Sequence, residues 1–175
     1  MKIILLFILL TVNCAGSDIT GEEIMPLAKA VWAENGIYWN NDASVVSIAY
    51  VIINRRDSSE GTFAKHMTID DVLNSGEIHG VGNGQYRAIE TLLDNGFQKS
   101  EYERKAWVRI FNAISRIAKG VYSDPTDGAL FFDHMRCDPL DLEPLAQKGR
   151  VMTGESIIPY KYIELGNGRY LYFWK

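Results

Sequence analysis

Glu34 is the residue of this sequence whose type and position best suit acid–base chemistry. It lies seven residues after Leu27 and three after Val31, at the edge of an apolar stripe with helical spacing. A carboxyl at such an edge is partly desolvated, which raises its pKa, and the negative end of the helix dipole acts in the same direction. A glutamic acid kept protonated in this way can donate to a glycosidic oxygen. Periodicity alone also allows a Glu that forms a salt bridge or fringes the core.

Other chemistries have little support in the sequence. His66, His79 and His134 are scattered and form no His-Glu-x-x-His pattern, so we expect no metal and no cofactor. No Gly-x-Ser-x-Gly elbow is present, and the glycines between positions 76 and 84 lack the ending of a phosphate-binding loop. A carboxyl-based reaction is therefore the chemistry that the residue types favour.

A helix must position Glu34. Apolar residues recur at helical spacing from Ile24 to Val31 and predict a first helix over 23–35. Pro26 is expected in its first turn, where a missing N–H costs least. Asn35-Gly36 supplies the stop signal of a left-handed C-terminal cap.

The rest of the chain predicts more helix than strand. Further helices are expected over 41–56, 68–76, 86–95 and 100–120, and strands over 129–132, 160–165 and 169–173. The helix over 41–56 is apolar nearly all round, which is typical of a buried central helix. Residues 77–84 read as a loop or small hairpin, 124–128 as a turn, and Gly166-Asn167-Gly168 as a hairpin turn. The expected fold class is α+β, mainly helical, with a minor β part.

The first residues have the pattern of a secretory signal peptide. Lys2 precedes an apolar run from Ile3 to Val12, and Ala15-Gly16-Ser17 offers a cleavage site. The run is shorter than the roughly 20 apolar residues of a spanning helix. We therefore expect a signal peptide over 1–17, a catalytic domain over 18–175, and export to the periplasm, cell envelope or medium. A hydrophobic first helix is the alternative, and Cys14 leaves a lipid anchor open.

Composition restricts the partners. The chain has 175 residues, of which 47% are hydrophobic and 23% charged, so it suits one folded domain. A net charge of −4 without charge runs argues against a nucleic-acid partner. Cys137 and Cys14 are the two cysteines, which excludes a disulfide framework in the mature chain. We expect a monomer.

Four segments, in this order and spacing, carry a family resemblance: Leu27–Glu34, Val51–Arg55, Gly84–Tyr86 and Asp124–Phe132. They resemble the cell wall hydrolase family of spore cortex-lytic enzyme catalytic domains. Ala33-Glu34 and the Asp-Pro-Thr-x-Gly-Ala turn at 124–129 are the most specific elements. The segment Ile163–Gly168 is similar to the family's closing segment, so the resemblance covers nearly all of 18–175.

The resemblance implies a lysozyme-like, transglycosylase-type fold that cuts the glycan strands of peptidoglycan, with Glu34 as the catalytic acid/base. It also implies that Gln85 lies near the substrate cleft with Tyr86 beside it. An amide can hydrogen-bond an acetamido group or a sugar hydroxyl, and a phenol ring can stack on a sugar. A surface Gln85 and a core Tyr86 are the alternatives.

The chain departs from the family's pattern in two places. Asn35–Asn40 replaces the small residue, Arg and Gly-Glu pair that usually follow the glutamate, and Arg87 stands at a position that is polar in the family. Tyr38 and Trp39 in the altered segment suit stacking on sugars, although a hydrophobic loop over the core is equally compatible.

A second carboxylate would decide the reaction type. Glycosidases with two carboxylates place them roughly 5 Å apart for retention or about 6.5 to 9.5 Å apart for inversion. Asp42 and Glu77 are candidates by their location in predicted loops. A lytic transglycosylase needs Glu34 alone, because a hydroxyl of the muramic sugar replaces water and the glutamate serves first as acid, then as base. A wall-binding module without turnover is the alternative from another class.

Overall fold

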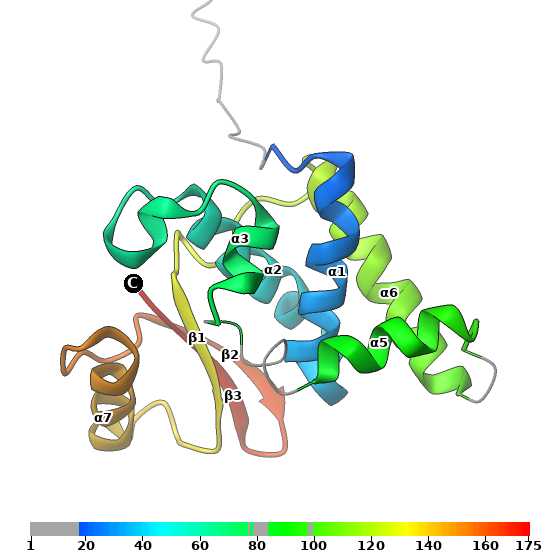
Figure 1. Ribbon diagram of the computed structural model, residues 1–175. Helices are drawn as coiled ribbons and strands as arrows, with labels where there is room; N and C mark the ends of the chain where they lie inside the picture. The colour runs from blue at the N-terminus through cyan, green and yellow to red at the C-terminus, as the bar shows by residue number, and fades with distance from the viewer. Residues whose placement is uncertain (1–17, 77, 79–83, 98–99) are drawn as a thin grey trace, which may run out of the picture.

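The computed structural model describes residues 18–76, 78, 84–97 and 100–175 (Figure 1). The expected signal peptide with Cys14 lies outside these residues, as do Glu77 and His79. The helices are α1 (Gly21–Asn35), α2 (Asp42–Asp57), α3 (Ile69–Asn74), α5 (Gln85–Asp94), α6 (Glu101–Ala118) and α7 (Leu142–Thr153), with 3-10 turns η1 (Gly36–Tyr38) and η2 (Gly61–Lys65). The strands are β1 (Phe131–Met135), β2 (Lys161–Gly166) and β3 (Arg169–Trp174). The prediction of a mainly helical α+β fold is confirmed.

The first helix, α1, begins earlier than its apolar spacing predicts. The Glu23 carboxylate accepts the backbone N–H of Thr20 at 3.0 Å and so starts the helix at Gly21. Pro26 is therefore the sixth residue of α1, and the prediction that it lies in the first turn is wrong. Burial alone would raise the pKa of Glu23, but hydrogen bonds from Thr20, Arg56 and Ile69 lower it.

The second helix, α2, is the central helix that its composition predicts. Asn41 caps it by accepting the backbone N–H of Ser44 at 3.0 Å, and every residue from Ser44 to Ile53 is buried. It contacts the helices α1, α3 and α6 and the strands β1 and β2. None of the helices in the described part of the chain is long and apolar enough to cross a membrane.

The three strands form an antiparallel sheet in the order β1-β3-β2. The hairpin around Gly166-Asn167-Gly168 is confirmed, whereas β1 begins at Phe131 rather than at Ala129. The backbone N–H of Ala129 instead bonds the carbonyl of Thr126, at 3.3 Å, so Ala129 closes the preceding turn.

The sheet separates two hydrophobic clusters. Leu171 and Phe173 of β3 face the main core of α1, α2 and α6, while Tyr172 and Trp174 face a smaller cluster with Leu145 of α7. Figure 1 shows the strands standing between α7 and the helices α1, α5 and α6. The molecule therefore has a helical part on one face of the sheet and α7 on the other.

Asn54 joins α2 to the turn over 124–128. Its side-chain amide nitrogen lies 3.1 Å from Asp124 Oδ2, 3.2 Å from Thr126 Oγ1 and 3.1 Å from the carbonyl of Ala129. The Asp124 carboxylate also accepts the backbone N–H groups of Thr126 at 2.7 Å and Gly128 at 2.8 Å. Two of the segments that carry the family resemblance are thus bonded to each other.

We expect Asp124→Asn to destabilise the protein at neutral pH by about 1 kcal/mol, because an amide nitrogen would face the N–H donors of the turn. Burial raises the pKa of Asp124, but the hydrogen bonds from Thr126, Gly128 and Asn54 outweigh it and leave the pKa lowered. The folded state therefore binds its proton at lower pH than the unfolded chain. The stabilisation is full above the unfolded pKa of about 3.9 and is lost as pH falls through the folded pKa.

Chemical unfolding of wild type and Asp124→Asn between about pH 6 and pH 2 measures this effect. The difference in free energy of unfolding should shrink towards zero at the acid end. Asp127→Asn is the control, because Asp127 lies in the same turn but is exposed and bonds Lys175. A difference that stays constant with pH would contradict the assigned role of the Asp124 carboxylate.

Candidate functional site

Glu34 lines a cavity of about 280 Å³ where the helical part meets β1 and α7. It is half-buried and comes from the last turn of α1. The other described residues that line it are Arg55, Ile78, Phe132, Asp133, His134, Lys148 and Met152. Charged groups from α1, α2, β1 and α7 therefore meet around one half-buried glutamate.

The end of α1 is fixed to α2 beside this cavity. Asn35 is fully buried, and its side-chain oxygen accepts the hydroxyl of Ser44 at 2.6 Å. Gly36 then turns the chain with a φ of +55°, which a residue with a side chain adopts at a cost. Helix α1 ends at Asn35, as the Asn35-Gly36 signal predicts, but the ψ of −123° at Gly36 is not that of the predicted left-handed cap.

Arg55 lines the cavity from the last turn of α2. Only 4% of it is exposed, and its Nε donates to the carbonyl of Leu130 at 2.6 Å. Its guanidinium lies 5.4 Å from the ring centre of Phe63 and 5.6 Å from that of Phe131. A buried cation is thereby held by α2 against the segment that leads into β1.

Asp133 is a second carboxylate in the Glu34 cavity, and the sequence did not single it out. It lies on β1, and its carboxylate forms an ion pair with Lys148 of α7, with the two atoms 2.5 Å apart. In the sequence, the feature that points to Asp133 as a site residue is its position directly after the predicted strand over 129–132. The pairing with Lys148 needs α7, which the sequence did not predict.

His134 lies between the cavity and the aromatic residue Tyr38. The two rings stack with centres 5.4 Å apart, and Arg169 donates to the Tyr38 hydroxyl at 2.6 Å. Burial, together with the charge of Arg169, lowers the pKa of His134 against the opposing effect of Asp133. One face of Tyr38 is therefore covered by the imidazole of His134. The described residues contain no group of three or more His, Cys, Asp or Glu that could hold a metal ion.

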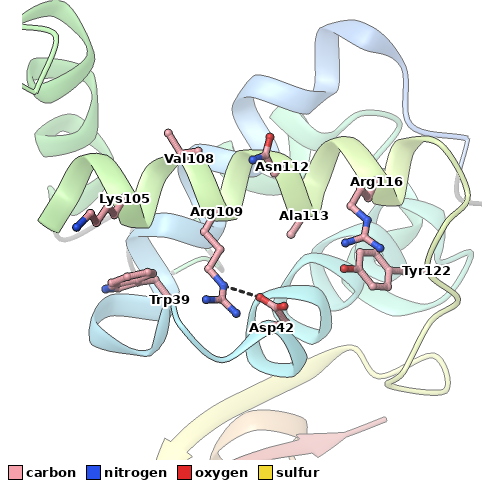
Figure 2. Close-up of a pocket in the computed structure, with 9 residues that line it drawn as sticks. All are labelled: Trp39, Asp42, Lys105, Val108, Arg109, Asn112, Ala113, Arg116 and Tyr122. Atoms are coloured by element: carbon pink, nitrogen blue, oxygen red, sulfur yellow. Dashed lines mark hydrogen bonds and ion pairs between the residues drawn. The ribbon is translucent and has the colours of Figure 1, made fainter. Parts of the chain in front are cut away.

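Asp42 does not line the Glu34 cavity. It lies at the start of α2 and pairs with Arg109 of α6 at 2.7 Å, in a groove of about 410 Å³ (Figure 2). The structure thus separates this candidate from Glu34. Glu77, the other candidate partner, is outside the described residues.

Gln85 and Trp39 share a third cavity, of about 340 Å³, which also includes Gly36. Its walls carry three aromatic side chains, and the ring of Trp39 meets that of Tyr102 edge to face with centres 5.3 Å apart. This cavity includes Gly36, which follows α1, and the Glu34 cavity includes a residue of the last turn of α1. Gln85 accordingly lines a different cavity from Glu34.

Tyr86 packs against the main core rather than into either cavity. The ammonium of Lys29 lies 5.6 Å from its ring centre. Burial and the charges of Asp70 and Glu90 raise the pKa of Tyr86 to about 12. This placement favours the alternative of a core tyrosine over a sugar-stacking role.

Comparison of the chain with family models, with curated proteins and with solved structures found no match.

Proposed function

We propose that this protein cleaves the glycan strands of peptidoglycan and that Glu34 transfers the proton. The main support is that segments with the family resemblance supply residues of the Glu34 cavity. The segments Leu27–Glu34, Val51–Arg55 and Asp124–Phe132, which are far apart in sequence, each contribute a residue to the Glu34 cavity. The fourth segment contributes Gln85 to the neighbouring cavity. Three of the four motifs that resemble one enzyme family therefore meet at the Glu34 cavity.

The proposed fold is lysozyme-like. In support, a glutamate at the end of a helix faces a small antiparallel sheet across a cavity with charged walls. Such a cavity can exclude part of the solvent from a glycosidic bond while hydrogen-bonding the sugars around it. We also propose that residues 1–17 direct the chain out of the cytoplasm, because peptidoglycan lies outside it.

In the proposed reaction the Glu34 carboxyl protonates the glycosidic oxygen as the bond to the sugar's anomeric carbon breaks. The resulting carboxylate then takes the proton from a hydroxyl of the same muramic sugar, which attacks the anomeric carbon and closes an anhydro ring. Every proton is returned, so the cycle needs no second catalytic group. This chemistry defines a lytic transglycosylase.

Hydrolysis is the second candidate reaction, and Asp133 favours it. Asp133 lines the same cavity as Glu34 and pairs there with Lys148. A second carboxylate beside Glu34 can direct a water or stabilise a cationic sugar. The two reactions differ in the chain end that they leave.

Mass analysis of the fragments that the purified protein releases from sacculi tests both proposals. We expect anhydro ends, and we expect Asp133→Asn to retain most of the rate, because transglycosylation needs Glu34 alone. Reducing ends, together with a loss of at least about tenfold in Asp133→Asn, would establish hydrolysis instead. Binding to sacculi without release of fragments would identify a wall-binding module.

A further inference from the structure

The groove that contains Asp42 is larger than the Glu34 cavity and runs between α6 and the start of α2. Figure 2 shows α6 along one wall, with Asp42, Trp39 and Tyr122 on the other. The polar residues that α6 contributes are Lys105, Arg109, Asn112 and Arg116. Their spacing of four, three and four residues places them on one side of the helix over roughly 16 Å, at 1.5 Å per residue.

The groove is cationic in a protein whose net charge is −4. Among the described residues that line it, three are cations and one, Asp42, is a carboxylate. That carboxylate bonds Arg109 through Nε at 2.7 Å, which leaves the terminal nitrogens of the guanidinium for another acceptor. Lys105 pairs with Glu101 on the same helix, and both are more than half exposed, so this pair is weak in water.

Arg116 has the most capacity to bind an anion. Its guanidinium lies 4.8 Å from the ring centre of Tyr122, and it forms no ion pair with any carboxylate in the described ranges. Asn112, between Arg116 and Arg109 on the same stripe, makes no hydrogen bond to a described residue. Donors of two kinds are therefore directed to solvent along one helix wall.

Trp39 connects this groove with the cavity of Gln85, because it lines both. The Gln85 cavity includes Gly36, two residues after Glu34. A polymer that lies along the Gln85 cavity would therefore pass Trp39 and meet the cations of the groove. The aromatic face of Trp39 suits a sugar ring, and the cations beyond it suit acidic groups attached to the sugar.

We propose that the groove in Figure 2 binds the carboxylates of the peptide stems that branch from the glycan strand, through Arg116 and Arg109. This inference rests on the proposed function, because it assigns the branched glycan as the ligand. It predicts that the protein prefers peptide-bearing strands over bare ones. Guanidinium groups suit carboxylates because their planar donors match both oxygens.

Binding measurements in the Glu34→Gln background test the inference without turnover. The probes are soluble glycan fragments with intact peptide stems, the same fragments after amidase removal of the stems, and a polyol phosphate polymer. We expect Arg116→Gln to weaken binding of the stem-bearing fragments about fivefold and to leave the bare fragments unchanged. Raising the salt concentration should reduce the difference, because the contact is partly exposed.

Arg104→Gln is the matched control, since it removes the same charge from an exposed position of α6 outside the groove. Equal effects of Arg116→Gln and Arg104→Gln would overturn the inference, as would equal affinity for stem-bearing and bare fragments or a preference for the phosphate polymer. Lysis by wild type with no effect of Arg116→Gln leaves the proposed function intact. If Arg116→Gln weakens binding of the stem-bearing fragments but wild type does not lyse sacculi, the inference about the groove stands and the proposed function fails.

Discussion

Glu34→Gln should slow the release of fragments from sacculi by about 10²- to 10⁴-fold, the usual contribution of a positioned acid–base group. Glutamine has nearly the same shape and still hydrogen-bonds, but it cannot donate a carboxyl proton to the glycosidic oxygen. Because Glu34 is half-buried at the end of α1, the amide fits the same position without a new charge. Turbidity loss of purified sacculi, followed over time, measures the rate.

Glu22→Gln is the control for this loss of activity. Glu22 is exposed in the first turn of the same helix and lies far along α1 from the Glu34 cavity. It should lyse sacculi at close to the wild-type rate. Both variants should unfold with nearly the wild-type midpoint, which separates a loss of chemistry from a loss of fold.

The pattern of the three rates decides between the functional classes. Wild-type activity with an inactive Glu34→Gln variant supports an enzyme that uses this residue. Equal activity of wild type and Glu34→Gln would overturn the assignment of Glu34. Absence of lysis by all three proteins, with sacculus binding retained, would favour a wall-binding module.

The helical part could be predicted because its signals are local. Asn41, Thr68 and Ser100 each cap a helix by accepting a backbone N–H three residues on. Each is the first residue of a helix range that the sequence predicts. The Gly166-Asn167-Gly168 hairpin is equally local. For such elements, the residues that determine the structure are neighbours in the chain.

The α7 helix and the Asp133 carboxylate could not be predicted, because their signals depend on distant parts of the fold. Gly149 lies within α7, and glycine disfavours helix in an isolated segment. Packing of Leu145 with Trp174 stabilises the helix instead. Asp133 gains its neighbour Lys148 only once α7 is in place.

The effect of Gly149→Ala tests this packing directly. A Cβ at position 149 would lie 1.9 Å from the carbonyl oxygen of Ile157 and 3.1 Å from Trp174 Nε1. The first contact is with backbone, so α7 or the segment that follows it must move. That shift would also disturb the bond from Trp174 Nε1 to the Ile157 carbonyl, which measures 3.3 Å. Overpacking of this kind costs about 2 kcal/mol.

Thermal unfolding should therefore show a midpoint about 4 to 8 °C lower for Gly149→Ala than for wild type. Gly21→Ala is the matched control, because a Cβ at the start of α1 has no atom within 4 Å. Alanine also has a higher helix propensity than glycine, so Gly21→Ala should leave the midpoint unchanged or slightly raised. If both variants unfolded at the same temperature, close packing of α7 on the Ile157 backbone would not be a source of stability. Since Lys148 precedes Gly149, a displaced α7 should also weaken the Lys148 pair with Asp133 beside Glu34.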